Sequence, residues 1–206
     1  MAVKILAENW AHRSDVRDRF LAEGRLLRRV RSPHVVTVHD VGELEDGRPY
    51  LVMAYLPRGS LAGWLAEFPT GRPPAEQALA LLRDVAAGLR ALHAAGIVHR
   101  DLNPRNILLD EDGAVLADLG LAKDLAAGSG LTQPMGTGRY RAPEQEDYSA
   151  EIGTATDVYA FGVLADELLD PHSRRPWVTR ALADARARDP GKRPSVNQLI
   201  TALETD

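Results

Sequence analysis

The chain has 206 residues, of which 45% are hydrophobic, so it can bury a core either as one domain or as two small lobes. Its formal net charge of −4 gives no basic field that would attract nucleic acid, and no apolar stretch is long enough to span a bilayer. It has no cysteine, which excludes disulfides, zinc–thiolate sites and a thiol nucleophile, and it lacks a signal-peptide pattern, so we expect it to be cytoplasmic.

The first 56 residues predict a small unit that mixes strands with one helix. Three apolar or alternating runs are typical of strands, and Glu45-Asp46-Gly47 supplies a turn between the last two. A helical pattern follows the first strand and begins at Ser14, a residue type that caps helices. The predicted strands cover residues 2–6, 35–41 and 49–55, and the predicted helix covers residues 14–31.

The remaining residues, 57–206, predict a mainly helical unit. The Pro57-Arg58-Gly59-Ser60 segment breaks the preceding pattern and is expected to be a hinge. A short hairpin is expected around Asp112-Gly113. The predicted helices cover residues 75–95, ended by Gly96, and then residues 154–169, 176–188 and 195–204.

One carboxylate stands inside an apolar helix stripe. Val16, Phe20, Leu27 and Val30 recur at helical spacing, and Glu23 occupies the middle position of the same stripe. A buried carboxylate is costly unless it is paired, which favours a cationic partner for Glu23. The alternative is a helix rotated so that Glu23 lies at the edge of the stripe.

The segment His99-Arg100-Asp101-Leu102-Asn103-Pro104-Arg105-Asn106 carries the strongest chemical signal. Phosphoryl transfer needs a carboxylate that orients the attacking hydroxyl and a nearby oxygen that holds a metal. Asp101 and Asn106 lie five positions apart on a predicted loop and are residue types that can provide such groups, and the apolar run at residues 107–109 can anchor the loop to the core.

This segment resembles the catalytic loop of protein kinases, and further kinase motifs occur in the right order along the chain. The resemblance is to bacterial serine/threonine protein kinases, and it implies an α+β, protein-kinase-like two-lobe fold with an incomplete β-rich N-lobe (residues 1–56) and a mainly helical C-lobe (residues 57–206). The supporting motifs are Ala2-Val3-Lys4-Ile5-Leu6, Asp118-Leu119-Gly120, Ala142-Pro143-Glu144, Asp157-Val158-Tyr159-Ala160-Phe161-Gly162 and Asp189-Pro190-Gly191-Lys192-Arg193-Pro194-Ser195.

The resemblance implies ATP and Mg²⁺ as cofactors and a role for each matching residue. Asp101 would be the catalytic base, and Lys4, paired with Glu23, would hold the α- and β-phosphates. Asn106 and Asp118 would bind the metal. The other implied positions are Met53 at the back of the adenine pocket, backbone groups of Ala54, Tyr55 and Leu56 facing the adenine, and Thr137 near the catalytic carboxylate.

Supporting roles follow from the same resemblance. Asp157 would hold the backbone of the catalytic loop, and Glu144 would pair with Arg193 in the interior. Arg100 beside Asp101 is typical of kinases controlled by phosphorylation of the activation loop. Ser129 and Thr132 are then either the phosphate acceptors or loop hydroxyls without a role.

Three features depart from the family pattern. No glycine-rich phosphate loop precedes Lys4, which indicates either a gene start placed too late or a pocket without its roof. Asn103 stands where the family usually has lysine, and Arg105 is a candidate substitute. Few residues separate Leu169 from Arg193, so the part of the C-lobe that docks substrate is expected to be reduced.

Two functional interpretations therefore remain open. The first is an ATP-dependent serine/threonine protein kinase, motivated by the retained Lys4, Glu23, Asp101, Asn106 and Asp118. The alternative is a pseudokinase or truncated remnant that acts as a nucleotide- or protein-binding module. A related small-molecule phosphotransferase is disfavoured by the Ala142-Pro143-Glu144 segment. The sequence does not identify the protein substrate.

Overall fold

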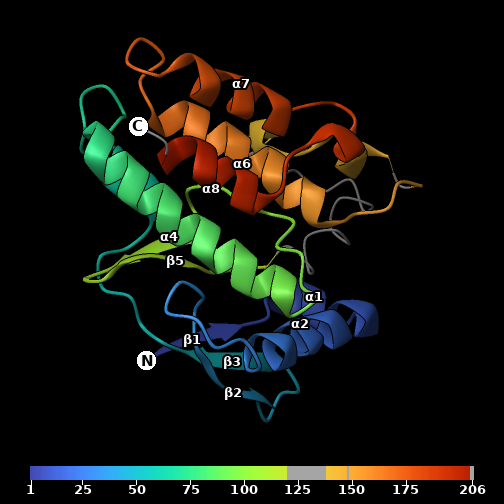
Figure 1. Ribbon diagram of the computed structural model, residues 1–206. Coiled ribbons are helices and arrows are strands. Elements are labelled where there is room, and N and C mark those ends of the chain that lie inside the picture. Colours follow the sequence, from blue (N-terminus) through green and yellow to red (C-terminus); the bar gives the residue numbers. More distant parts are fainter. Residues whose placement is uncertain (120–137, 148, 205–206) are drawn as a thin grey trace.

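The computed structural model describes residues 1–119, 138–147 and 149–204. A three-stranded antiparallel sheet forms one end of the molecule, and a stack of helices forms the other (Figure 1). The sheet has the order β1-β3-β2, and its strands are β1 (Ala2–Ile5), β2 (Val38–Glu43) and β3 (Pro49–Met53). Lys4 of β1 lies opposite Leu51 of the central strand.

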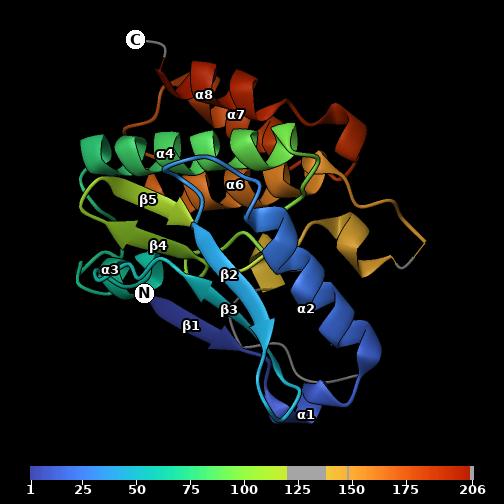
Figure 2. The same cartoon turned by 90° about the horizontal axis from the view of Figure 1, so that it is seen from below.

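Two helices accompany the sheet, α1 (Glu8–Ala11) and α2 (Ser14–Leu27). Helix α2 lies diagonally across β2 and β3 (Figure 2). The contact is close because Gly24 has no side chain: a Cβ there would lie 2.2 Å from Leu51 Cδ2. Glu23 is 1% exposed on the same face. The carboxylate of Glu23 is therefore buried where α2 packs on the sheet.

The chain then forms α3 (Leu61–Leu65), α4 (Ala75–Ala94) and a two-stranded antiparallel hairpin of β4 (Ile107–Asp110) and β5 (Gly113–Leu116). Helix α4 packs against β5 on one side and against α6 and α8 on the other. It ends before Gly96, whose φ of +74° suits a glycine after a helix. The segment after α4 leads directly into the loop that contains Asp101.

The last part of the chain contains α6 (Thr154–Leu168), α7 (Pro176–Ala185) and α8 (Val196–Glu204), with short 3-10 turns at Gly138–Tyr140, Pro143–Glu146 and Pro190–Lys192. Helix α6 is the centre of this stack, since Phe161, Leu164 and Ala165 are fully buried. One large hydrophobic core joins these helices to α4 and the hairpin.

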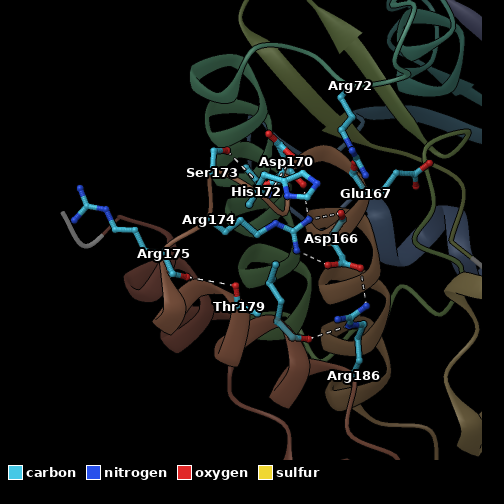
Figure 3. Close-up of polar contacts among 12 residues, drawn as sticks. Arg72, Asp166, Glu167, Asp170, His172, Ser173, Arg174, Arg175, Thr179 and Arg186 are labelled. Atoms are coloured by element: carbon cyan, nitrogen blue, oxygen red, sulfur yellow. Dashed lines mark hydrogen bonds and ion pairs between the residues drawn. The ribbon is translucent and has the colours of Figure 1, made fainter.

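Arginines bind the end of α6 (Figure 3). Arg174 contacts the Asp166 carboxylate and the carbonyls of Asp166 and Leu169, and Arg186 bonds the same carboxylate at 2.7 Å. Arg72 Nε donates to the Glu167 carbonyl at 2.9 Å. Cations at the C-terminus of a helix satisfy its last carbonyls and complement its dipole. They fix the position of Glu167, which becomes important below.

The predicted elements differ from the observed ones mainly at their ends. The predicted helix over residues 14–31 ends at Leu27, and Arg13, not Ser14, is its N-cap residue. The predicted strand over residues 35–41 is shifted to Val38–Glu43, because Val35 and Val36 pair with Leu116 of β5 instead. Helices α1 and α3 were not predicted from the sequence.

The α+β class and the kinase-like arrangement expected from the motifs agree with this architecture. The division at residues 56 and 57 stays a prediction. Among the residues that the structure describes, no helix is both long and apolar enough to cross a bilayer.

Candidate active site

The Asp101 carboxylate is held by the two asparagines of its own loop. Asn106 Nδ2 donates to Asp101 Oδ2 at 2.6 Å and to the Asp101 carbonyl at 2.8 Å. Asn103 Nδ2 donates to the same carbonyl at 2.9 Å and to Oδ1 at 3.2 Å. Both oxygens of the carboxylate are thus oriented by neutral donors, which fix its direction without neutralising its charge.

Buried Asp157 of α6 holds the backbone that precedes Asp101. Its two oxygens accept hydrogen bonds from the His99 and Arg100 amides, both at 2.8 Å, and His93 of α4 binds the same carboxylate at 2.8 Å. Arg100 has a φ of 68°, a strained region for a residue with a side chain. Gln145 Nε2 adds a bond of 2.8 Å to the Arg100 carbonyl. The strained turn is therefore fixed from both sides.

His99 contributes to this loop as a neutral side chain. It is fully buried, and burial lowers the pKa of its imidazole despite the nearby charges of Asp157 and Asp101. A neutral ring adds no positive charge beneath the Asp101 carboxylate.

Lys4 joins the sheet to the loop that follows β5. Its Nζ lies 2.7 Å from Asp118 Oδ1, across 114 positions of sequence, and 3.9 Å from Glu23 Oε1. Burial would lower the pKa of Lys4, but the charges of Asp118 and Glu23 outweigh it and raise that pKa above 10.5. The expected pair with Glu23 is present, while the shorter contact, with Asp118, was not foreseen.

Asp118 and Asn106 are neighbours through the backbone. The Ala117 amide donates to the Asn106 carbonyl at 2.9 Å, and Asp118 follows with a φ of 54°. Carboxylate and amide oxygens are the donors that Mg²⁺ prefers. Among the described residues, no group of three or more acidic, histidine or cysteine side chains gathers to hold a metal. Asp118 and Asn106 supply two such oxygen donors, which suits a metal that is also held by phosphate oxygens, the usual arrangement for Mg²⁺ beside a nucleotide.

The strip from Met53 to Leu56 connects the sheet to the helices. The Ala54 amide donates to the Thr37 carbonyl at 2.9 Å, so Ala54 can offer only its carbonyl to a ligand. Met53 and Leu56 are partly buried, and Tyr55 is 63% exposed. The side chain of Tyr55 therefore points away from the protein interior, and only its backbone could face an adenine.

A buried ion pair lies beneath the site. Arg193 makes two parallel bonds to Glu144, 2.6 and 2.7 Å long, and Thr156 Oγ1 donates to Glu144 at 2.9 Å. Burial would raise the pKa of Glu144, but the hydrogen bonds from Arg193 and Thr156 outweigh it and lower that pKa below 4.5. Gln145, which binds the catalytic loop, follows Glu144 directly, so the pair fixes this support in place.

Sequence reasoning missed two contributors. Asn103 was noted as a missing lysine, yet it is 1% exposed and braces the loop, because it also accepts the Arg105 amide at 3.0 Å. Gln145 gave no signal beyond its place after the Ala142-Pro143-Glu144 motif. Thr137, Ser129 and Thr132 lie outside the described residues.

The chain is similar to several known proteins. A family described as "Protein kinase domain" matches residues 1–189. The serine/threonine-protein kinase PknL of Mycobacterium tuberculosis is 41% identical over 179 residues, which are 84% of this chain and 43% of PknL. A Corynebacterium efficiens protein named as serine/threonine-protein kinases drp72 is 35% identical over 86% of this chain and 34% of its own length.

Among solved structures, the Mycobacterium tuberculosis PknI kinase domain superposes with a TM-score of 0.76 and 28% sequence identity. The superposition covers 98% of this chain and 82% of that domain. The chain spans less than half the length of the curated relatives it matches here.

Proposed function

Because this chain belongs to the protein kinase domain family, we propose that it transfers the γ-phosphate of ATP to serine or threonine hydroxyls of proteins. The observation that carries the proposal is the meeting of Lys4 and Asp118 from distant parts of the chain beside the Asp101 loop. Protein substrates and ATP are the proposed partners, and the cytoplasm, where ATP is abundant, is the proposed location.

Asp101 is the proposed catalytic base. Its oriented carboxylate accepts the hydroxyl proton while the substrate oxygen bonds to the γ-phosphorus and the bond from phosphorus to the bridging oxygen breaks, releasing ADP. Asn103 and Asn106 position this carboxylate. The arrangement supplies orientation, which is the main component of catalysis in phosphoryl transfer.

Lys4, Glu23, Asn106 and Asp118 are proposed to hold the nucleotide. Mg²⁺, when bound, would neutralise charge on the phosphates, with Asp118 and Asn106 as its protein ligands. Lys4 would bind the α- and β-phosphates, and Glu23, 3.9 Å from Lys4 Nζ, would keep it in place. Met53, the Ala54 carbonyl and the backbone of Tyr55 and Leu56 would face the adenine.

The test is intact mass of the chain and of a serine-containing protein after incubation with ATP and Mg²⁺. We expect mass gained in units of one phosphate, reduced roughly 10²–10⁴-fold in Asp101→Asn. Asp112→Asn is the matched control, because Asp112 lies in the exposed hairpin turn away from the site. No phosphate in the parent, or equal phosphate in Asp101→Asn, would contradict the proposal and favour a binding module.

A further inference from the structure

A small cavity lies beside the catalytic loop, away from the residues proposed to bind the nucleotide. Its volume is about 190 Å³, and its wall includes Asn103, Pro104 and Arg105 of the loop with Arg139, Tyr140 and Glu167. Asn103 also bonds the Asp101 carboxylate. The cavity therefore lies within a few residues of the proposed base.

The carboxylate in this cavity is already occupied. Arg139 Nη2 contacts Glu167 Oε1, and the Tyr140 hydroxyl donates to Glu167 Oε2. Burial and the adjacent Glu167 raise the pKa of Tyr140, so the hydroxyl keeps its proton and remains a donor. Both oxygens of Glu167 thus have a partner inside the protein.

The position of Glu167 also explains why it needs these partners. It lies in the last turn of α6, where the partial negative charge of the helix end disfavours a carboxylate. Arg139 offsets this repulsion at the carboxylate, and Arg72 binds the carbonyl of the same residue. In Figure 3, the Glu167 side chain points away from the Asp166–Arg174–Arg186 contacts.

The two arginines that line the cavity, Arg105 and Arg139, have guanidinium groups that solvent can reach. Arg105 is exposed, and within the described part of the chain no carboxylate pairs with its guanidinium. Arg139 contacts Glu167 and the Tyr140 hydroxyl through Nη2, and its side chain is 58% exposed, so solvent still reaches its guanidinium. The charged residues that line the cavity are Arg105, Arg139 and Glu167. Two positive charges and one negative charge give the cavity a net positive charge.

We propose that this cavity binds an acidic side chain, an aspartate or glutamate of the protein substrate near the phosphorylated residue, through Arg105 and Arg139. The inference rests on the proposed kinase function and names its substrate class. Arg pairs readily with carboxylates through charge-assisted hydrogen bonds. Asn103 lines the cavity and also bonds the Asp101 carboxylate at 3.2 Å, so a substrate residue bound in the cavity would lie close to the residue that accepts phosphate.

The experiment compares peptides that contain one serine and differ at a single flanking position, which carries Glu, Ala or Lys in turn. Dissociation constants measured by fluorescence anisotropy without ATP need no catalysis, and kcat/KM with ATP and Mg²⁺ follows for the same peptides. At one position we expect the Glu peptide to bind about tenfold or more tightly than the Lys peptide, the strength of a charge-assisted hydrogen bond.

Three variants test the assigned residues in opposite directions. Arg105→Ala should reduce the preference for Glu, and Arg139→Ala should abolish or reverse it, because it also releases Glu167 Oε1. Glu167→Gln should increase the preference, since it removes the carboxylate and keeps both arginines. Arg83→Ala, which breaks a surface pair with Glu204 on α4 and α8, is the control and should change nothing.

The outcomes separate this inference from the proposed function. A parent that binds the Lys peptide more tightly, or a Glu preference that survives both arginine substitutions, would overturn the acidic-residue assignment even if every peptide is phosphorylated. Charge-selective binding without phosphate transfer would support the cavity and contradict the kinase proposal. A phosphoserine peptide that binds more than tenfold more tightly than the Glu peptide would reassign the cavity to phosphorylated residues.

Discussion

The sheet region (residues 1–53) and the helical region (residues 57–204, as far as described) hold their site residues by different means. In the helical region, buried polar groups such as Asp157 and the Glu144–Arg193 pair fix the catalytic loop within a large core. In the sheet region, Lys4 lies on an edge strand over a small core of Leu6, Val16, Phe20 and Leu51. The proposed base is thus rigidly supported, whereas the proposed nucleotide ligand Lys4 depends on a thin sheet.

Breaking the buried Glu144–Arg193 pair should give the largest loss of stability and so tests how firmly the helical region is held. Arg193→Ala leaves Glu144 buried without its cation, so we expect a loss of about 3–5 kcal/mol in the free energy of unfolding, measured by urea denaturation. Arg83→Ala, at an exposed pair, should cost at most about 1 kcal/mol. Equal losses in both variants would mean that the Glu144–Arg193 pair does not support the helical region.

A second test compares two buried aromatic residues, Phe161 of the large core and Phe20 of the small one. Each substitution to alanine should cost about 3–5 kcal/mol where the surrounding structure stays folded. Because the core around Phe20 is small, Phe20→Ala should open the sheet region alone. Hydrogen exchange measures this directly: amides of α2 and β3 should exchange fast while those of α6 remain protected. Global exchange in both variants would show one cooperative unit.

Asp157→Asn gives an intermediate effect. The amide keeps one acceptor oxygen for the His99 and Arg100 amides and loses the other, which should cost about 1–3 kcal/mol of stability. Phosphate transfer should fall more steeply than stability, since the Arg100 turn positions Asp101. Asp166→Asn, at the far end of α6, is the matched substitution. A normal transfer rate in a destabilised Asp157→Asn would contradict the positioning role.

The pH dependence of stability should report the same ion pair. The pKa of Glu144 is lowered from 4.5, so its contribution is complete above 4.5 and is lost as pH falls through the folded value. Glu144→Gln lacks this proton, and its stability should therefore fall less between about pH 5 and about pH 3. A single proton accounts for at most about 1.4 kcal/mol per pH unit. Parallel pH profiles of parent and variant would argue against the pair.

The smallest expected effect lies on the exposed edge of the sheet. Val3 is 58% exposed and Ile5 is 43% exposed on β1. Val3→Thr and Ile5→Thr keep a β-branched side chain, so we expect stability changes within about 0.5 kcal/mol and less self-association at high concentration. Light scattering against concentration measures the second effect. A loss of several kcal/mol would show that these side chains are covered in solution.

Site residues could be predicted from the sequence where a residue's chemistry and its place in the order of motifs point to the same role. The catalytic loop and Glu23 within its stripe could be anticipated from residue types and spacing, whereas the Glu144–Arg193 pair was anticipated only from the resemblance to protein kinases. The shift of the strand to Val38 could not, because an apolar run predicts burial and does not say whether the partner is β3 or β5. Helix α3 is only five residues long, and its single signal was Ser60, whose Oγ accepts the Gly63 amide.

Long-range polar contacts were the hardest to predict. Lys4 and Asp118 are far apart in sequence, and no local pattern says which of Glu23 or Asp118 is nearer to the lysine. Asn103 was interpreted by what it replaces, although its two-sided amide suits a brace that both donates and accepts. Arg139 and Glu167 are ordinary surface residues in sequence, and only the end of α6 brings them together.

The backbone at Arg100 is left-handed, a conformation that strains any residue other than glycine. At a φ of 68°, an arginine costs about 1–2 kcal/mol that a glycine would largely avoid. A chain shaped for stability alone would place glycine there. An arginine at this strained position indicates a role for its side chain beyond forming the turn, and Arg100→Gly should lower phosphate transfer more than it lowers stability.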